Sequence, residues 1–144
     1  MKILWTDGSA DPHPGPGGWA VIDADTKSPV LTGNEPDTTN IRMEGIAIRE
    51  AIKYAILRDD SVEIHTDSEF WINVLTKWAQ TWEKNGWKKK QGEIKNLDLV
   101  QELYELYKNH NVNFVWVKGH AGLELNELAD DSANLARENR SNSR

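Results

Sequence analysis

The sequence predicts an α/β domain built on a five-stranded mixed β-sheet that is flanked by helices. Three β-type runs come first, at residues 2–7, 19–22 and 30–32, and helical and β-type segments alternate from residue 39 onward. Strands joined by short turns pair antiparallel, whereas strands separated by a helix can pair in parallel, so the sheet should be mixed. The 144 residues, 38% of them hydrophobic, suffice for one domain with a single core.

The first half of the chain predicts a β-meander followed by a helix. The Gly-Pro-Gly-Gly cluster at 15–18 indicates a turn before the second strand, and the third strand completes the meander. After Thr39 and Asn40 the period changes, because apolar side chains now recur at helical spacing and basic side chains lie opposite them. The apolar stripe comprises Ile41, Ala47, Ile48, Ala51, Ile52 and Ala55, and the opposite face carries Arg42, Arg49 and Lys53.

The second half of the chain alternates strands and helices. Polar residues at the end, 139–144, are expected to form a disordered tail, so the predicted domain covers 1–138. The predicted elements are a strand at 61–66, a helix at 68–82, a helix from the N-cap Asn96 to residue 107, a strand at 112–117 and a helix at 126–137.

A tryptophan-rich basic segment follows the helix at 68–82. Trp71 and Trp78 are seven residues apart, which predicts that both pack in the core. Residues 84–95 carry five lysines and one glutamate, a local charge of +4, which leaves −10 for the rest of a chain whose total is −6. Screening by salt limits the range of interactions between exposed charges to about 8 Å. A polyanion could therefore bind to this segment despite the negative net charge of the chain. The alternative is a solvated loop.

Composition excludes several classes of site. The chain has no cysteine, which rules out disulfides and thiolate metal sites and leaves carboxylates and four histidines as ligands. No stretch approaches the roughly 20 apolar residues of a membrane span, and residue 1 leads directly into a strand without a signal-peptide pattern. We therefore expect a cytoplasmic protein that does not bind a membrane.

Three carboxylates occupy positions that are unfavourable for an anion. Asp7 and Asp67 each follow a threonine at the carboxyl end of a strand, and Glu44 falls within the apolar stripe of the first helix. If the two strands are parallel neighbours, these acids meet and repel one another by several kcal/mol per pair, at about 4 Å and an effective dielectric near 20. Bound Mg²⁺ would relieve that repulsion and indicates phosphodiester chemistry. The alternatives are turn-forming aspartates and an exposed glutamate at a helix start.

The carboxyl-terminal third adds a histidine and a fourth acid. His120 lies between Gly119 and Gly122 after the last strand, in a loop that suits proton transfer, although a lone histidine is more often structural. Asp130 and Asp131 lie at roughly equal angles from the apolar stripe of the last helix. We expect one of them to complete the site, and the helical wheel does not choose between them.

Several short phrases follow one another in a distinctive order. They are Thr6-Asp7-Gly8-Ser9, Pro14-Gly15-Pro16-Gly17-Gly18, Thr38-Thr39-Asn40, Arg42-Met43-Glu44, Thr66-Asp67-Ser68, Gly86-Trp87-Lys88, Trp116-Val117-Lys118-Gly119-His120-Ala121-Gly122, Asn126-Glu127 and Ala129-Asp130. Any one phrase is weak evidence, but this combination resembles the type 1 ribonucleases H of bacteria over about residues 3–137. The resemblance implies the three-layer ribonuclease H-like fold.

The resemblance also implies the chemistry. Asp7, Glu44, Asp67 and Asp130 match the four catalytic, metal-binding acids, and His120 matches the loop histidine that assists turnover. In this family two Mg²⁺ ions, for which Mn²⁺ is a possible substitute, act while the RNA strand of an RNA–DNA hybrid is cut to 5′-phosphate and 3′-hydroxyl ends.

A substrate-binding surface is implied as well. The basic segment resembles the protrusion that grips the DNA strand, and His13 and Glu69 stand where relatives commonly place Asn and Gln toward the RNA 2′-hydroxyls. The expected substrate-binding residues are Ser9, His13, Thr39, Asn40, Glu69, Trp82, Trp87, Lys88, Lys89 and Asn96.

We therefore expect a monomeric, metal-dependent ribonuclease H that acts on RNA–DNA hybrids. The alternative is a noncatalytic hybrid- or duplex-binding module of the same fold. Four intact acids argue against it, because a pure binder gains nothing from burying them beside a phosphate. A nuclease of the same fold that carries out DNA strand transfer is disfavoured by the His120 loop and the basic segment.

Overall fold

A five-stranded mixed sheet forms the centre of the protein in a computed structural model that describes residues 1–90, 92–118 and 124–142, with side chains described as far as 138. The strand order is β3-β2-β1-β4-β5, with antiparallel pairing among the first three strands and parallel pairing of β4 with β1 and β5. The predicted mixed sheet is thus confirmed. The strands are β1 (Lys2–Ala10), β2 (Gly15–Asp23), β3 (Ser28–Thr38), β4 (Val62–Thr66) and β5 (Val112–Trp116).

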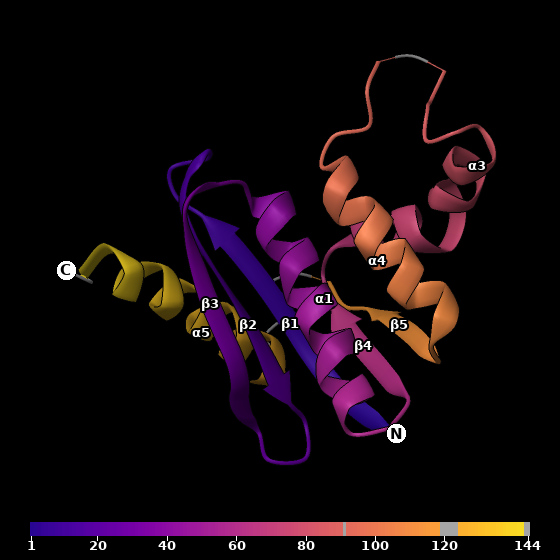
Figure 1. The fold of residues 1–144 in the computed structure, drawn as a ribbon. Helices are drawn as coiled ribbons and strands as arrows, with labels where there is room; N and C mark the ends of the chain where they lie inside the picture. Colours follow the sequence, from indigo (N-terminus) through magenta and orange to yellow (C-terminus); the bar gives the residue numbers. More distant parts are fainter. Residues whose placement is uncertain (91, 119–123, 143–144) are drawn as a thin grey trace.

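Helices cover both faces of the sheet. Helices α1 and α4 lie together on one face, and α5 lies on the other face against β1, β2 and β3 (Figure 1). Over the described residues, no helix combines the length and apolar character needed to cross a bilayer. The helical elements are α1 (Asn40–Leu57), α2 (Glu69–Asn73), the π-helical turn η1 (Val74–Trp78), α3 (Ala79–Lys84), α4 (Leu97–Asn109) and α5 (Glu124–Asn142).

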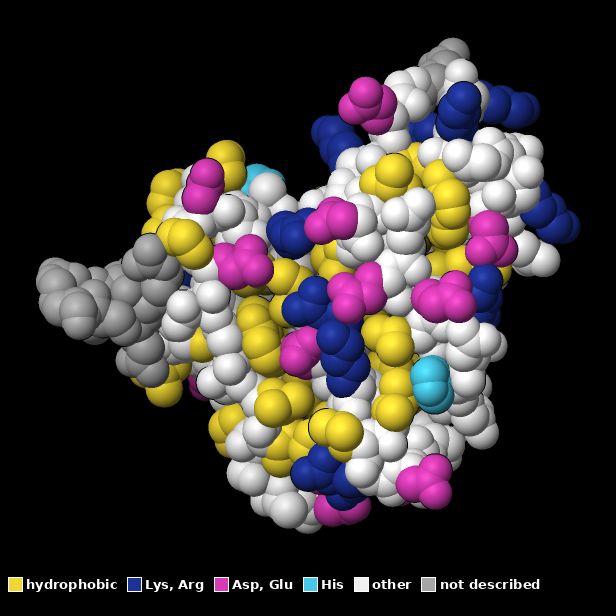
Figure 2. All heavy atoms as spheres, viewed as in Figure 1, with side chains coloured by type: hydrophobic (Ala, Val, Ile, Leu, Met, Phe, Trp, Pro, Cys, Tyr) yellow, Lys and Arg dark blue, Asp and Glu magenta, His cyan; other side chains and the backbone are white. Residues whose placement is uncertain are grey.

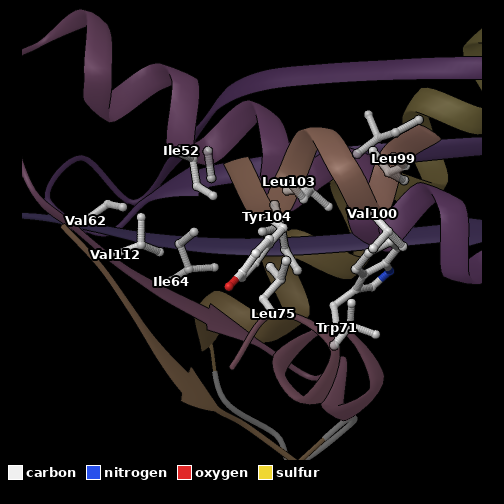
Figure 3. Packing of buried hydrophobic residues seen from close by; sticks show 14 of the residues in the cluster. Ile52, Val62, Ile64, Trp71, Leu75, Leu99, Val100, Leu103, Tyr104 and Val112 are labelled. Atoms are coloured by element: carbon white, nitrogen blue, oxygen red, sulfur yellow. The ribbon is translucent and has the colours of Figure 1, made fainter. Parts of the chain in front are cut away.

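The main core lies between the sheet and the layer of α1 and α4. Side chains from β4, β5, α2, η1 and α4 meet there, as Figure 3 shows for Ile64, Trp71, Leu75 and Leu103. Each of these four side chains is almost completely buried. Such burial of an aliphatic side chain contributes about 1.5–3 kcal/mol to the stability of the folded state. This core holds α1 against the sheet.

Gly8 sets how closely α1 approaches β1. A Cβ atom at Gly8 would lie 2.3 Å from the Met43 carbonyl carbon and 2.5 Å from the Glu44 amide nitrogen. Only glycine therefore allows the first turn of α1 to rest directly on the strand. Thr39 caps that turn by accepting a hydrogen bond from the Arg42 amide at 3.2 Å, as a helix N-cap requires.

The first three strands are longer than the sequence predicts, and the glycine cluster lies inside β2 rather than in a turn. The reason is close packing. A Cβ atom at Gly17 would lie 2.8 Å from the Met43 side chain, and one at Gly18 would lie 2.4 Å from the Ala133 carbonyl oxygen of α5. Because these glycines have no side chain, a helix can pack closely on each face of the strand. The sequence alone does not distinguish glycines used for close packing from glycines used in a turn.

The predicted helix at 68–82 is divided by the π-helical turn η1. Because its hydrogen bonds span five residues, it adds one residue to the turn and shifts every later side chain around the axis. Trp71 is buried as predicted, but the prediction for Trp78 is wrong, since 41% of its surface is exposed. Ala79 takes the buried position instead, eight residues after Trp71 rather than seven.

Three other features differ from the sequence-based expectation. Ile41 belongs to the predicted apolar stripe, yet it is exposed in the first turn of α1. Asn96 precedes α4 in a left-handed conformation (φ 57°), but its side chain does not cap the helix. α5 continues to Asn142, beyond the predicted end at 137, so its backbone is helical where the sequence predicts a disordered tail.

The approach at Gly8 makes a testable prediction. Gly8→Ala should lower the free energy of unfolding by about 1–3 kcal/mol, because the new methyl group must displace backbone atoms of α1. Urea denaturation measures the effect. Asn113→Ala, at an exposed position of β5, is the control and should stay within about 0.5 kcal/mol of the wild type. Equal stability of Gly8→Ala and the control would contradict the close approach.

Candidate active site beside the carboxyl end of β4

Two aspartates meet because β1 and β4 are parallel neighbours. Trp5 of β1 pairs with His65 of β4, so two residues further along each strand Asp7 lies next to Asp67. Asp7 does not end its strand as the sequence predicts, since β1 continues to Ala10, but it lies just past the last pair that β1 forms with β4, and Asp67 directly follows β4. The two aspartates therefore meet beside the carboxyl end of β4, where α/β proteins commonly bind ligands.

Glu44 joins this pair from the first turn of α1. Carboxylate oxygens of Asp7, Glu44 and Asp67 all lie within 4.8 Å of one another. The glutamate reaches this position because Gly8, the residue after Asp7, lets the helix backbone touch the strand. Asp7 is 7% exposed, and Glu44 and Asp67 are half-buried.

The environment disfavours negative charge on this cluster. Burial raises the pKa of Asp7 to about 8, and the charge of Asp67 adds to the shift, while the Gly8 amide opposes it by donating a 2.9 Å hydrogen bond. Burial also raises the pKa of Glu44 to about 9, assisted by the charges of Asp67 and Asp7. Without a cation, the cluster therefore retains protons at neutral pH.

Helix α5 contributes a fourth acid. The Asp130 carboxyl group lies close enough to Asp7 to raise the pKa of Asp7 further. Asp130 is half-buried, whereas Asp131 points to solvent and is exposed. Of the two residues that the helical wheel left equivalent, Asp130 is thus the more buried and the one that lies beside Asp7. His120, the expected loop histidine, lies outside the described residues.

The donor set suits a hard divalent cation. Only carboxylate oxygens converge, and Asp67 Oδ1 is buried without a hydrogen-bond partner among the described residues. Such an oxygen loses hydration without compensation unless a cation binds it. Oxygen ligands of this kind favour Mg²⁺ over softer metals.

Three of the expected substrate-binding residues lie beside this cluster, where the loop between β1 and β2 meets α1. The Asn40 side chain accepts a 2.6 Å hydrogen bond from the Ala10 amide, and the Asn40 amide donates to His13 Nδ1 at 3.2 Å. Ser9 is half-buried on β1 and contacts α5. Glu69 is exposed at the first position of α2, two residues after Asp67.

Thr39 and Asn96 are joined by a residue that the sequence analysis did not assign to the site. The backbone amide of Arg42 donates a hydrogen bond to Thr39 Oγ1. Its guanidinium group donates to Asn96 Oδ1 at 3.4 Å and to the Asp98 carboxylate at 3.0 Å. Hydrogen bonds to Asp98 raise the pKa of Arg42. In the sequence, Arg42 is indistinguishable from the other basic residues on the outer face of α1.

Aromatic and basic residues surround a small cavity beyond this cluster. The cavity has a volume of about 170 Å³, and its wall includes Ile41, Phe70, Trp78, Trp82, Lys89 and Asn96. The rings of Trp78 and Trp82 lie 6.1 Å apart. Trp78, which the sequence analysis expected in the core, therefore lines this cavity, because the π-helical turn brings it to the surface.

The basic segment projects from the rest of the molecule between α3 and α4. Figure 2 shows several Lys and Arg side chains around this projection, and Lys88 and Lys89 are exposed there. Trp87 is half-buried and packs edge-on against Tyr104 of α4, with ring centres 6.2 Å apart. The segment is therefore anchored by an aromatic contact while its lysines face solvent.

Comparisons with known proteins agree on one family. The RNase H family model matches residues 1–138. Ribonuclease H of Gluconobacter oxydans (strain 621H) is 42% identical over 137 residues, which cover 94% of this chain and 91% of the relative. Ribonuclease H of Legionella pneumophila (strain Lens) is 41% identical over 138 residues, covering 94% and 96%.

Solved structures show the same fold. LC9-RNase H1, a type 1 RNase H with the type 2 active-site motif, has a TM-score of 0.78 and 30% identity and covers 96% of this chain and 74% of its own. LC11-RNase H1 in complex with an RNA/DNA hybrid has a TM-score of 0.71 and 22% identity, with 98% and 99% covered, which compares the fold alone. The expected three-layer fold is confirmed, and the chain belongs to the ribonuclease H family of nucleases.

Proposed function

We propose that the protein is a metal-dependent endoribonuclease that hydrolyses the RNA strand of RNA–DNA hybrids, leaving 5′-phosphate and 3′-hydroxyl ends. The observation that carries this proposal is the cluster of Asp7, Glu44 and Asp67, whose carboxylate oxygens lie within 4.8 Å of one another. Burying these acids costs free energy, as their raised pKa values indicate, and a purely structural role would not require it. A cation-dependent reaction does require it.

Asp7, Glu44, Asp67 and Asp130 would hold two Mg²⁺ ions, or Mn²⁺ in their place, when substrate is bound. The fit rests on the all-oxygen donor set and on the unpartnered buried oxygen of Asp67. The ions would supply charge stabilisation at the attacking water and at the leaving 3′ oxygen. The chain's own contribution is to position three of the acids on β1, α1 and α5 and the fourth, Asp67, directly after the end of β4.

The surface beside the acids suits a nucleic-acid duplex. Exposed lysines of the segment at 84–95 would contact phosphates of the DNA strand, and Thr39, Arg42 and Asn96 form a polar cluster of suitable size for one phosphate. Trp78 and Trp82 offer aromatic surface between these two sites. Relatives named ribonuclease H, 42% and 41% identical to this chain, support the choice of substrate.

A cleavage assay tests this function. The wild type should cut an RNA–DNA hybrid in the presence of Mg²⁺ but not in EDTA, and should leave double-stranded RNA and double-stranded DNA intact. Asp7→Asn should lose at least a hundredfold in kcat because it removes a metal ligand, without loss of metal-free stability because a neutral amide replaces a buried carboxyl group whose ionisation is disfavoured. Asp131→Asn, at an exposed neighbour of Asp130, should retain wild-type turnover. Near-normal turnover of Asp7→Asn at saturating Mg²⁺ would contradict the metal site.

The acids should also make metal-free stability depend on pH. A carboxyl group whose pKa is raised on folding binds its proton more tightly in the folded state, so its stabilisation is full below the unfolded pKa and is lost as pH approaches the folded pKa. With Asp7 near 8 and Glu44 near 9, against ordinary values of 3.8 and 4.5, the free energy of unfolding in EDTA should fall from about pH 4 to about pH 9. Urea titrations across this range measure the decline.

Asp7→Asn provides the matched control for the pH series, since one titrating group is gone and the decline should become shallower. Excess Mg²⁺ should oppose the decline in the wild type, because the cation binds the ionised form. A metal-free stability that stays constant or rises between these pH values would rule out the proposed proton retention.

The basic segment should control binding rather than chemistry. Replacing Lys88, Lys89 and Lys90 by Ala should weaken hybrid binding and lower the slope of log K against log salt by about 0.7 to 0.9 for each phosphate that the lysines no longer neutralise. Turnover at saturating substrate should survive. Lys53→Ala, on α1 and paired with Glu102, is the control for a lysine distant from the segment. Unchanged affinity and slope in the triple variant would show that the lysines form a solvated loop.

A further inference from the structure

A row of polar side chains continues outward from the acid cluster along β1 and α5. Ser9 follows Asp7 by two residues and so lies on the same face of β1. On α5, Asn134 and Arg137 follow Asp130 by four and seven residues, which places all three on one face of the helix. Asp7 meets Asp130, and Ser9 meets both Asn134 and Arg137.

The hydrogen bonds of this row define what Ser9 can offer to a ligand. Its hydroxyl donates to Asn134 Oδ1 at 3.0 Å and accepts from Arg137 Nη1 at 3.1 Å. A serine hydroxyl has one hydrogen to donate and two lone pairs to accept with. No other group among the described residues bonds to this oxygen. The hydrogen is therefore committed, and one lone pair is left for an incoming donor.

The row is rigid because α5 lies directly on the sheet at this point. Ser9 pairs in register with Gly18 of β2, where a Cβ atom would come within 2.4 Å of the Ala133 carbonyl oxygen. Asn34 of β3 also donates to the Ala136 carbonyl oxygen at 3.2 Å. Asn134 and Arg137 thus reach Ser9 from a helix that is fixed against two strands, rather than from a loop.

Ser9 lies within reach of the strand that the acids would cut. Two residues of β-strand separate the Asp7 and Ser9 Cα atoms by about 6.6 Å. That distance is about twice the 3.4 Å rise per nucleotide along the axis of a duplex. The group that distinguishes RNA from DNA on such a strand is the 2′-hydroxyl, which can both donate and accept.

We propose that Asn134 and Arg137 are positioning residues that fix the Ser9 hydroxyl as a hydrogen-bond acceptor for a 2′-hydroxyl of the RNA strand near the cleaved bond. This inference rests on the proposed function and adds a determinant of its specificity. The acceptor polarity has a chemical consequence: a 2′-hydroxyl satisfies Ser9, whereas a 2′-fluoro group, which can only accept, does not.

Hybrids with a single modified sugar test the polarity. The substrate is a hybrid whose RNA strand is cut at one phosphodiester and carries 2′-hydroxyl, 2′-fluoro or 2′-deoxy at each neighbouring sugar in turn. For the wild type, one sugar should show a preference for hydroxyl over fluoro of about fivefold in kcat/KM, the value of one hydrogen bond. Ser9→Ala should abolish the preference at that sugar, because the acceptor is gone.

The α5 variants separate positioning from mere support of the fold. Asn134→Ala releases the Ser9 hydrogen, which can then turn toward fluorine, so the preference should fall below the wild-type value. It should not vanish, because Ser9 still accepts from a 2′-hydroxyl and carbon-bound fluorine is a weak acceptor. Asn134→Asp can only accept, so it should keep the preference even where the added charge alters KM. A general loss of structure would lower cleavage of all three substrates alike and leave their ratio unchanged.

Two results would overturn the inference: a wild type that does not prefer hydroxyl over fluoro at any sugar, or an Asn134→Ala variant that keeps the wild-type preference. Both can occur while the unmodified hybrid is cut in Mg²⁺, so they leave the proposed function intact. Failure of the wild type to cut the unmodified hybrid would instead overturn the proposed function itself.

Discussion

The contact between the backbone of α1 and the backbone of β1 at Gly8 is the constraint on which the site depends. It brings the Glu44 amide to the strand next to Asp7, so the glutamate side chain cannot avoid the two aspartates. Burial and the neighbouring negative charges raise the pKa values of Asp7 and Glu44 in this arrangement. The core behind α1, anchored by Trp71 against Gly45, supplies the packing that holds this unfavourable arrangement.

Each layer of the fold adds one part of the site. The parallel register of β1 and β4 pairs the aspartates, the α1 layer adds Glu44, and the opposite layer adds Asp130. The acids therefore surround one point at the sheet edge from both faces. Such an arrangement is hard to build from a single loop, and it explains why a site of four small side chains needs most of a domain to hold it.

The sequence predicts those features that follow from repeated local patterns. The repeated Thr-Asp phrase and the order of strands and helices suffice to predict that Asp7 and Asp67 meet. Helical periodicity does not choose between Asp130 and Asp131, because burial against the sheet decides it. It also fails at Trp78, since the turn η1 changes the period within one predicted helix. The bonds of Ser9 to α5 join residues more than 120 positions apart, so no local pattern reveals them.

The π-helical turn η1 also bears on how this surface can evolve. Because η1 adds one residue, the helix after it is rotated about its axis relative to the helix before it. This rotation places the small Ala79 in the interior and the large Trp78 at the surface. One insertion thereby gives an aromatic side chain to solvent without any change of side-chain identity, and without a new cavity in the core. For the same reason, a chain one residue shorter within 74–78 would present different residues on this face, and its positions would have to be matched to these by helical phase rather than by residue count.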